Sequence, residues 1–562
     1  MKPKWIKILF IVLLLGLFVL GGGYAGYRGY KSIRQARLVK EARGYLDQKE
    51  LRKAQLCLQR AVRYNNRDLE TCRLMARLAE ESGSAAGALL WRGRVVELNP
   101  PSLDDRLALA QAAVANRDFI TATNALAAVD ARDKQTATFH NIAGGVAAAA
   151  NLTTQAEEHF REATRLEPEN AIMQLNLAVV HLSQTNAPDQ AQARTSLKAV
   201  AKNPTNATLR CEALRHLTMD ALRHNQTDAA QMLTQQLLME TNSVFRDRLL
   251  RLEVLRVTKS AQFNPTLVTY QLEAITNTGT LFELSAWQIN KLGAESTLAW
   301  LRTLPAETRT NQPAALFLAQ CLAATKNWTN LQAALDVQNW GDLDFYRRAY
   351  KTLALRGQAL DGASKAEWEL ALRVANNQLR GLVMLKNFAA EQKWLSEAEE
   401  VLWTIVRRFP TERGAVQELS QVLYFSGRTR PFMNLFTQVM QRDPNDLAAR
   451  NNVALAALLL EANELKPHDL AREAYEKAPT NSACASTYAY SLHVQAKDAQ
   501  ALKVMQNLGP KALEDPSISG YYGLILKATG DSERAKTYLN WAFKSPLLPE
   551  ERKLFETARS RN

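Results

Sequence analysis

The N-terminal part of the chain is dominated by one uninterrupted apolar run. Residues 8–27 are twenty positions without a charge, bounded by Lys7 and Arg28. A helix of that length extends about 30 Å at about 1.5 Å per residue, which matches the hydrocarbon core of a bilayer. From there to the C-terminus, apolar residues recur at helical spacing between short polar turns. The pattern predicts an all-α protein with one N-terminal transmembrane helix.

A retained anchor and a cleaved signal peptide both fit the apolar run. For cleavage, residues 8–20 would be the apolar region, and Gly23 and Ala25 the small residues before the cut. Retention is favoured because the full run can span a bilayer and tyrosines stand at its exit, where phenol rings lie among headgroups. We therefore expect a single-pass membrane protein of a bacterial inner membrane.

The orientation of this helix is weakly determined, since lysines precede it and five basic residues follow it closely. Short lysine-bearing tails usually stay inside, which slightly favours an extracytoplasmic position for the rest of the chain. Gly22 and Gly26 form a G-x-x-x-G pair, which allows two such helices to approach closely. Homodimerisation through this pair is a hypothesis, and the alternative is that both glycines only face lipid.

After the apolar run, the sequence repeats with a period of thirty-four residues. An alanine recurs at this spacing, a larger residue usually follows four positions later, and a second small residue three positions further on. These positions are Ala54, Ala88, Ala122 and Ala156, then Leu58, Arg92, Leu126 and Phe160, then Ala61, Val95, Val129 and Ala163. Fixed self-similarity indicates one supersecondary unit that buries its apolar face only by stacking on its neighbours.

This pattern resembles the tetratricopeptide repeat (TPR), whose second helix carries small, large and small residues at these offsets, often before a proline. Residues 155–163 followed by Pro168 match it best, although the first helix of that unit has Ala147 where the family has an aromatic residue. The pattern returns over residues 379–548, beginning at Ala398. The resemblance implies a right-handed α-α superhelical solenoid of TPR helix hairpins.

The same comparison divides the chain into seven segments. Residues 242–378 keep helical periodicity but lose the small, large and small pattern, and the last segment predicts a capping helix with a polar face. The segments are a short basic tail (1–7), the transmembrane helix (8–27), a basic juxtamembrane segment (28–34), an N-terminal TPR array (35–241), degenerate helical repeats (242–378), a C-terminal TPR array (379–548), and the capping helix and tail (549–562).

The positive charge of the chain is concentrated near the apolar run. Residues 1–60 hold thirteen lysines and arginines against three carboxylates, and so carry +10 of the net charge of +14. A basic block beside a membrane helix is better explained by anionic lipid headgroups, at about 1 kcal/mol per residue near the surface. We expect lipid contact through residues 8–27 and this basic flank, and no nucleic acid, because no aromatic and basic binding motif accompanies the charge.

Candidate catalytic or metal-binding chemistry is missing from the sequence. It contains no phosphate loop, His-Glu-x-x-His motif or G-x-S-x-G elbow, and its histidines lack ligand spacing. We therefore expect no enzyme activity, cofactor or metal. Five cysteines without a C-x-x-C are interpreted as small buried hydrophobes. Seven of the ten tryptophans lie between 287 and 403, either as fillers of wide gaps or as an aromatic recognition surface.

The TPR resemblance also implies where a peptide would bind. In that family, ligands usually lie in the concave groove lined by the first helix of each pair. Its groove positions fall on Arg43, Arg73, Arg77, Asn141, Asn387, Gln417, Gln421, Tyr424, Tyr490 and His493. The resemblance thus implies a cationic groove near the membrane, unless its arginines are neutralised by Glu80 and Glu81, and a polar and aromatic groove further along the chain.

The expected function is a membrane-anchored TPR scaffold that mediates protein-protein interactions through this extended groove. Its partners would be other proteins or peptides. The alternative is an accessory subunit of an envelope polysaccharide or lipopolysaccharide assembly or export machine. The membrane-tethered repeat protein of lipopolysaccharide assembly shares the anchor and array, but its C-terminal paired-cysteine metal module has no counterpart in this sequence.

Overall fold

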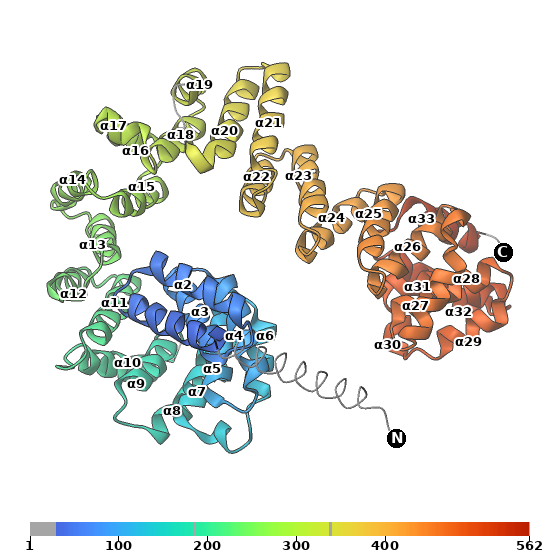
Figure 1. The fold of residues 1–562 in the computed structure, drawn as a ribbon, viewed down its shortest axis with the longest axis horizontal. Helices are drawn as coiled ribbons and strands as arrows, with labels where there is room; N and C mark the ends of the chain where they lie inside the picture. The colour runs from blue at the N-terminus through green and yellow to red at the C-terminus, as the bar shows by residue number, and fades with distance from the viewer. Residues whose placement is uncertain (1–29, 185, 337–339, 561–562) are drawn as a thin grey trace, which may run out of the picture. The chain divides into compact units, whose positions relative to one another are not determined.

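The computed structural model describes residues 30–184, 186–336 and 340–560, and helices account for most of that part of the chain (Figure 1). The all-α prediction is confirmed there. Within these ranges, no helix is both long and apolar enough to cross a membrane. The predicted transmembrane helix, its signal-peptide alternative and the Gly22 and Gly26 contact lie outside the described residues.

The described residues fall into two compact units that divide between Glu273 and Ala274. The first unit begins with a helix over residues 30–47. It continues with α2 (Leu51–Tyr64), α3 (Leu69–Glu81), α4 (Ala85–Leu98), α5 (Leu103–Ala115), α6 (Phe119–Ala127), η1 (Asp133–Gln135), α7 (Ala137–Ala149), α8 (Thr153–Leu166), α9 (Ala171–Ser183), α10 (Ala187–Val200), α11 (Ala207–Arg223), α12 (Thr227–Met239), α13 (Phe245–Val257) and α14 (Phe263–Ala274).

The second unit repeats the same arrangement of successive helices and ends with one extra helix. It contains α15 (Thr278–Leu292), α16 (Ala294–Thr303), α17 (Ala306–Thr310), α18 (Ala314–Ala324), α19 (Trp328–Asp336), η2 (Gly341–Leu343), α20 (Asp344–Gly357), α21 (Asp361–Ala375), α22 (Leu379–Glu391), α23 (Leu395–Arg408), α24 (Arg413–Phe425), α25 (Thr429–Arg442), α26 (Leu447–Leu459), η3 (Asn463–Leu465), α27 (Pro467–Lys477), α28 (Ser482–Val494), α29 (Asp498–Gln506), α30 (Pro510–Leu513), α31 (Pro516–Ala528), α32 (Ser532–Ala542) and α33 (Pro549–Ser560).

A recurring backbone turn joins the two helices of most pairs. Its central residue has a positive φ, and in the first pairs this residue is Lys49, Gly83, Arg117 and Asn151, which are evenly spaced. The next residue donates its N–H five positions back, as from Ser84 to the carbonyl of Ala79 at 2.8 Å. This is the hydrogen bond of a Schellman motif, which satisfies carbonyls that a helix end leaves free. Backbone geometry therefore repeats with the same period as the alanines.

The turn also continues through the centre of the chain, where the side-chain pattern is lost. Asn225 and Lys259 have positive φ at the same spacing as the first turns, and Lys326 and Ala359 repeat the turn at a step one residue shorter. Gly293 also has a positive φ between them, but there its own N–H donates five positions back, to the carbonyl of Gln288. In residues 242–378 the small, large and small side-chain pattern is therefore lost, whereas the backbone turns recur at a nearly constant spacing. This regularity is not visible in the sequence, because lysine, asparagine and alanine all occupy the central position of the turn and no single residue type marks it.

The small positions of the repeat lie where the two helices of a pair cross. Ala54, Ala88, Ala122 and Ala156 are each at most 2% exposed. In the best-matching unit, Gly144 on α7 faces Phe160 on α8, and a Cβ on this glycine would come within 2.7 Å of the ring. The ring of Phe160 therefore packs over the small residues of α7, in a cluster that also contains Ala147.

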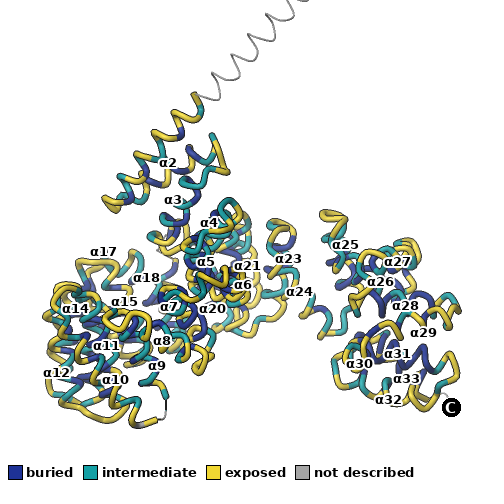
Figure 2. Tube along the Cα trace, turned by 90° about the horizontal axis from the view of Figure 1, so that it is seen from below, coloured by how far each residue is buried: buried dark blue, intermediate teal, exposed yellow. Residues whose placement is uncertain are grey.

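First helices also pack on one another from pair to pair. In the first unit α5 contacts α7, α7 contacts α9, and α9 contacts α11; in the second, α18 contacts α20, α20 contacts α22, α26 contacts α28, and α28 contacts α31. Buried residues run along α28 and α31 as a result (Figure 2). Over these stretches of each unit the first helices therefore form a layer, as a helical-repeat array requires.

The tryptophan and cysteine interpretations can be compared with burial. Trp300, Trp340 and Trp368 are buried, and the other four central tryptophans are half-buried. Burial agrees with the gap-filling interpretation for the three buried rings. Four of the five cysteines are buried and the fifth, Cys57, is half-buried. Burial raises the pKa of the Cys321 thiol to about 11, which keeps it protonated and unreactive at neutral pH.

Candidate protein-binding face

The arginines predicted to line a groove near the membrane are all paired with carboxylates. Arg43 bonds to Glu70, and Arg77 contacts Asp47 at 2.9 Å and Glu81 at 2.7 Å. These pairs reduce the charge that the arginines offer to an acidic peptide. The structure thus supports the alternative in which neighbouring carboxylates neutralise them, with Glu81 in the predicted role and Glu80 bound by Arg92 instead.

Arg73 has a structural role between two repeats. Its guanidinium donates two hydrogen bonds to Asp105 on α5, at 3.0 Å and 2.5 Å, and the Asp105 side chain is 5% exposed. Desolvation opposes ionisation there, but bonds from Arg73, Ser102 and Asn99 lower the pKa of Asp105. Arg215 and Asp247 repeat the arrangement between α11 and α13. These ion pairs connect each first helix to the next one along the array.

The remaining groove residue predicted in the first unit also forms a hydrogen bond within the protein. Asn141 on α7 accepts a hydrogen bond of 2.8 Å from the side chain of Asn176 on α9. The pairing again joins two consecutive first helices. Of the four groove residues predicted in the first unit, each therefore has a polar partner within the protein.

Three groove positions of the second unit are open. Asn387 on α22 and Gln417 and Gln421 on α24 are exposed. Among the described residues, none of their side chains forms a hydrogen bond. Phe425, one turn beyond Gln421, is 64% exposed, so the stripe combines amide groups with an aromatic ring. Such a surface can bond to a peptide backbone through its amides and bury an apolar side chain against the ring.

The other three positions of the second unit are covered by the C-terminal helix, α33. The hydroxyl of Tyr424 donates a hydrogen bond of 2.8 Å to Glu551. Tyr490 is 6% exposed in a cluster that contains Phe555 of α33. The cluster also takes Leu458 and Leu459 from α26 and Leu524 from α31. The segment predicted as a capping helix and tail contains α33, which lies along the layer of first helices as well as against the last pair.

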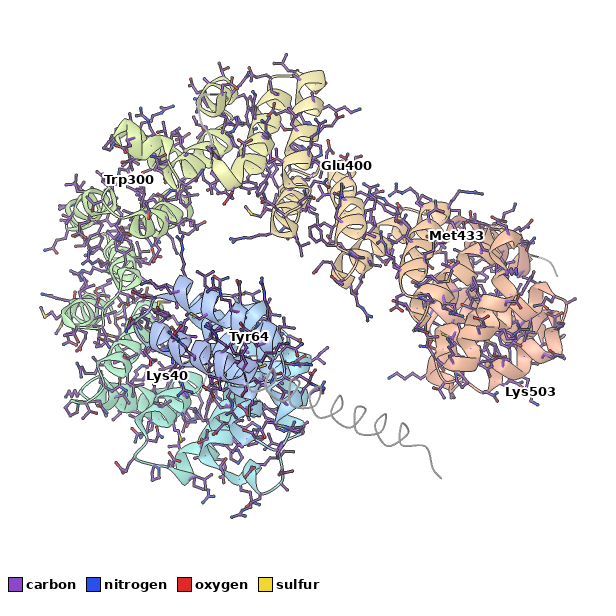
Figure 3. The ribbon with its side chains drawn as sticks, viewed as in Figure 1. Lys40, Tyr64, Trp300, Glu400, Met433 and Lys503 are labelled. Carbon is purple, nitrogen blue, oxygen red and sulfur yellow. The ribbon has the colours of Figure 1, made fainter. Side chains whose placement is uncertain are left out.

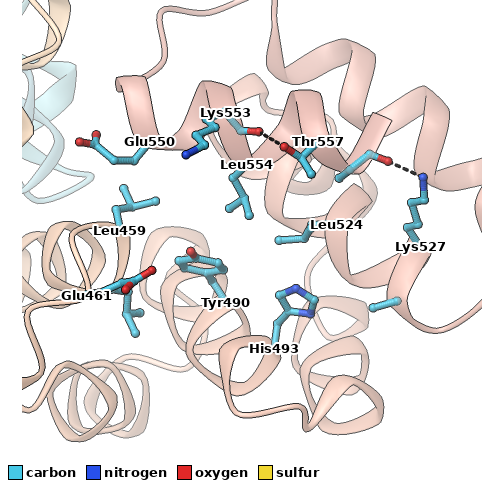
Figure 4. A pocket seen from close by; sticks show the side chains of 13 residues that line it. Leu459, Glu461, Tyr490, His493, Leu524, Lys527, Glu550, Lys553, Leu554 and Thr557 are labelled. Atoms are coloured by element: carbon cyan, nitrogen blue, oxygen red, sulfur yellow. Dashed lines mark hydrogen bonds between the residues drawn. The ribbon is translucent and has the colours of Figure 1, made fainter. Parts of the chain in front are cut away.

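His493 lies beside this helix at the edge of a cavity of about 560 Å³ (Figure 4). Its Nδ1 is 2.5 Å from a carboxylate oxygen of Asp498. Tyr490 and Leu524 line one wall of the cavity, and Lys553 and Leu554 of α33 line another. The cavity is therefore the space that α33 leaves unfilled on the first-helix layer.

Glu551 holds α33 in place through a buried carboxylate that is 3% exposed. It accepts hydrogen bonds from the hydroxyl of Tyr521 at 2.5 Å, the hydroxyl of Tyr424 at 2.8 Å and the backbone N–H of Leu548 at 2.9 Å. Burial raises the pKa of Glu551, and the three donors only partly oppose this effect. The same environment raises the pKa of Tyr490 to about 12.

No metal site emerges from the described residues, because none of their His, Cys, Asp and Glu side chains cluster in threes. His140 and His159 lie with their Nδ1 atoms 3.0 Å apart, beside Phe139. Burial lowers the pKa of both rings, so the neutral pair shares one N–H···N hydrogen bond. His159 is thus a structural histidine with a hydrogen-bond partner, and His181 lies 3.3 Å from Glu157.

Helix pairs with evenly spaced backbone turns, buried small residues at their crossings and a layer of stacked first helices define a TPR-like helical-repeat protein. No protein-family model matches the chain, and no curated protein matches it. The TPR-like description of this chain therefore rests on the geometry of its helices alone.

Several solved structures are similar to it at low scores. A chain of the APC/C hetero-tetramer Cut9-Hcn1 has 12% identity and a TM-score of 0.27, with 82% of this chain and 96% of that chain covered. PilF of Pseudomonas aeruginosa has 18% identity and a TM-score of 0.27, with 46% and 99% covered. A chain of Naa15/Naa10 bound to HypK-THB has 14% identity and a TM-score of 0.29, with 94% and 79% covered.

Proposed function

We propose that this protein is a membrane-anchored scaffold that holds other proteins along the first-helix layer of its second unit. One observation carries the proposal: this layer already binds a helix, α33, over α24, α26, α28 and α31. The stripe of Asn387, Gln417, Gln421 and Phe425 extends beyond α33 and is open. A partner segment would bind there next to α33.

Attachment to a membrane is the second part of the proposal. It rests on the uncharged run of residues 8–27 and on the basic residues that flank it. A tether of this kind would concentrate a partner at the membrane surface. The position of the array on the extracytoplasmic side and a homodimer through Gly22 and Gly26 remain hypotheses of the sequence.

Site-specific photocrosslinking in native membranes tests the scaffold. A photoreactive amino acid at Asn387, Gln417 or Gln421 is expected to give discrete adducts with another protein. The same group at the exposed Asn434 and Gln441 of α25 is the matched control, because α25 is the second helix of the pair that α24 begins. Adducts of equal yield at all five positions, or adducts at none, would refute the proposed binding face.

The alternative function is an accessory subunit of an envelope polysaccharide or lipopolysaccharide assembly or export machine. It shares the tether and the scaffold with the first proposal and differs only in the identity of the partner. The same adducts discriminate the two, since a polysaccharide synthase or export pore crosslinked at Gln417 or Gln421 would favour the alternative. We place it second because the amide groups and the aromatic ring of the open stripe suit protein partners in general. They do not favour an envelope assembly or export machine over other partners.

A further inference from the structure

The first helix pair encloses a cavity at the end that follows the apolar run. The cavity measures about 560 Å³ and lies between the helix over residues 30–47 and the last turns of α2. Five of its lining residues are cationic, and Glu41 is its one carboxylate. The cationic residues are Lys31, Arg34, Arg37, Arg60 and Arg63. We call this cavity the cationic cleft.

Helical spacing explains why these charges converge. Residues 31, 34, 38 and 41 line one stripe of their helix, at steps of three and four, and residues 60, 63 and 64 do the same on α2. The two helices run in opposite directions after a short turn, so the early residues of one face the late residues of the other. Lys40 and Tyr64 mark the two helices (Figure 3).

Three of these five cations lack a carboxylate partner among the described residues, unlike the arginines of the next helix pair. Glu41 is bound to Arg37 at 2.9 Å. Within the described part of the chain, Arg34, Arg60 and Arg63 form no ion pair. In the next helix pair, by contrast, Arg73, Arg77 and Arg92 each bind a carboxylate. The cleft therefore brings together three arginines that no carboxylate of the described residues pairs with.

The walls of the cleft are held in place by contacts outside it. Gln35, which is 7% exposed, donates a hydrogen bond of 3.0 Å to the hydroxyl of Thr71 on α3. Arg34 donates to the hydroxyl of Tyr30 at 3.0 Å, and its guanidinium lies 5.4 Å from the centre of that ring. A ligand would meet Arg34 and Arg37 already oriented by Tyr30 and Glu41, which lowers the entropy lost on binding.

Several unpaired cations in one concavity repel one another, and an anion relieves this repulsion. The guanidinium fork matches the oxygen geometry of a phosphate group, so arginine is the residue expected for a phosphate site. The ordinary alternative is that basic residues complement a helix C-terminus. That explains Arg63 in the last turn of α2 but not the residues contributed by the other helix.

We propose that the cationic cleft binds the phosphate group of an anionic phospholipid headgroup. The inference rests on the membrane attachment in the proposed function, because Lys31 follows the apolar run by four residues and the cleft would then lie at headgroup level. Free phosphate offers the same chemistry from another source. A headgroup in the cleft would fix the first helix pair against the bilayer and so set the direction in which the array leaves it.

Calorimetric titration of the full chain in a non-ionic detergent tests the site. The ligands are short-chain phosphatidylglycerol, short-chain phosphatidylcholine and inorganic phosphate. The cleft variant combines Arg34→Gln, Arg60→Gln and Arg63→Gln, three exposed positions. The control variant, Arg132→Gln with Arg223→Gln and Arg302→Gln, removes the same charge at exposed arginines outside any ion pair of the described residues.

Phosphatidylglycerol is expected to bind the unmodified chain more tightly than phosphatidylcholine. The cleft variant should lose roughly tenfold or more of that affinity and the control variant none, as charge-assisted bonds to phosphate predict. Equal affinity in all three proteins, or equal loss in both variants, would overturn the site. Inorganic phosphate binding as tightly as phosphatidylglycerol would overturn the lipid source. A chain that binds phosphatidylglycerol but gives no crosslinks would refute the scaffold and keep the cleft.

Discussion

A single buried carboxylate connects the C-terminal helix to the rest of the second unit. Glu551 is surrounded by the hydroxyls of Tyr424 and Tyr521 and by the N–H of Leu548. Burial raises its pKa above the ordinary value of 4.5, so its protonated form is favoured when α33 is docked. The stability that this group contributes is fully present below the ordinary pKa and is lost as pH rises through the raised value.

We therefore predict that α33 is held more tightly at about pH 5 than at about pH 8. Hydrogen exchange of residues 549–560 measures this directly, as faster exchange at the higher pH after correction for the intrinsic rate. Glu551→Gln removes the titrating group and is expected to flatten the dependence. Glu556→Gln, on the same helix but exposed, should leave the dependence as it is. Equal protection of α33 at both pH values in the unmodified chain would contradict the prediction.

At the scale of elements, α33 docks through one close approach. A Cβ on Gly520 of α31 would lie 2.4 Å from the ring of Phe555, which is 1% exposed. The ring can occupy this position only because residue 520 has no side chain. Pro549 also packs beside Gly427 in the turn between α24 and α25. Two glycines far apart in the sequence thus create the space for the helix.

Gly520→Val is predicted to displace α33, since overpacking costs about 1 to 3 kcal/mol. Limited proteolysis with trypsin followed by mass spectrometry should show cleavage at Arg552 and Lys553 accelerated by roughly tenfold, the equivalent of about 1.4 kcal/mol. Displacement would also open the face of α26 and α28 to partners.

Gly145→Val controls for the general effect of valine in place of a helical glycine, because Gly145 faces open space. It should leave the cleavage of α33 unchanged. Unaltered cleavage in the Gly520→Val protein would show that Phe555 can move without releasing the helix.

At the scale of the whole molecule, stability is distributed along the array. Each pair contacts its neighbours in sequence, as α5 does α7 and α7 does α9. In such an array, stability is close to a sum of repeat terms and nearest-neighbour terms. A destabilising substitution should therefore accelerate hydrogen exchange in its own and neighbouring repeats and leave the exchange of distant repeats unchanged.

Ala122→Trp tests this behaviour, because Ala122 is fully buried at the crossing of α5 and α6. The loss is expected to be about 1 to 3 kcal/mol or more. Hydrogen exchange should accelerate in α5 to α8 and remain unchanged in α26 to α33. Ala127→Trp places the same side chain at an exposed position of α6 and should have little effect. Uniform acceleration over both units would contradict nearest-neighbour stability.

The sequence by itself determined the helices, their pairing and the period at which the pairs repeat. These features depend on local periodicity and on residue size at each crossing, both of which are visible along the chain. The periodicity of the central turns is not encoded in any one residue type, because the backbone conformation is repeated there while the residue changes.

Only the tertiary structure decided which groove residues are open. Arg73 pairs with Asp105 from the following first helix, and Tyr424 bonds to Glu551, which lies 127 residues further along the chain. Gln417 and Gln421, on the same helix as Tyr424, stay exposed. The partner of a polar side chain is set by packing between distant segments, and a local pattern does not contain that information. The physical reason is that a helix stripe specifies which residues share a face, whereas docking specifies what covers it.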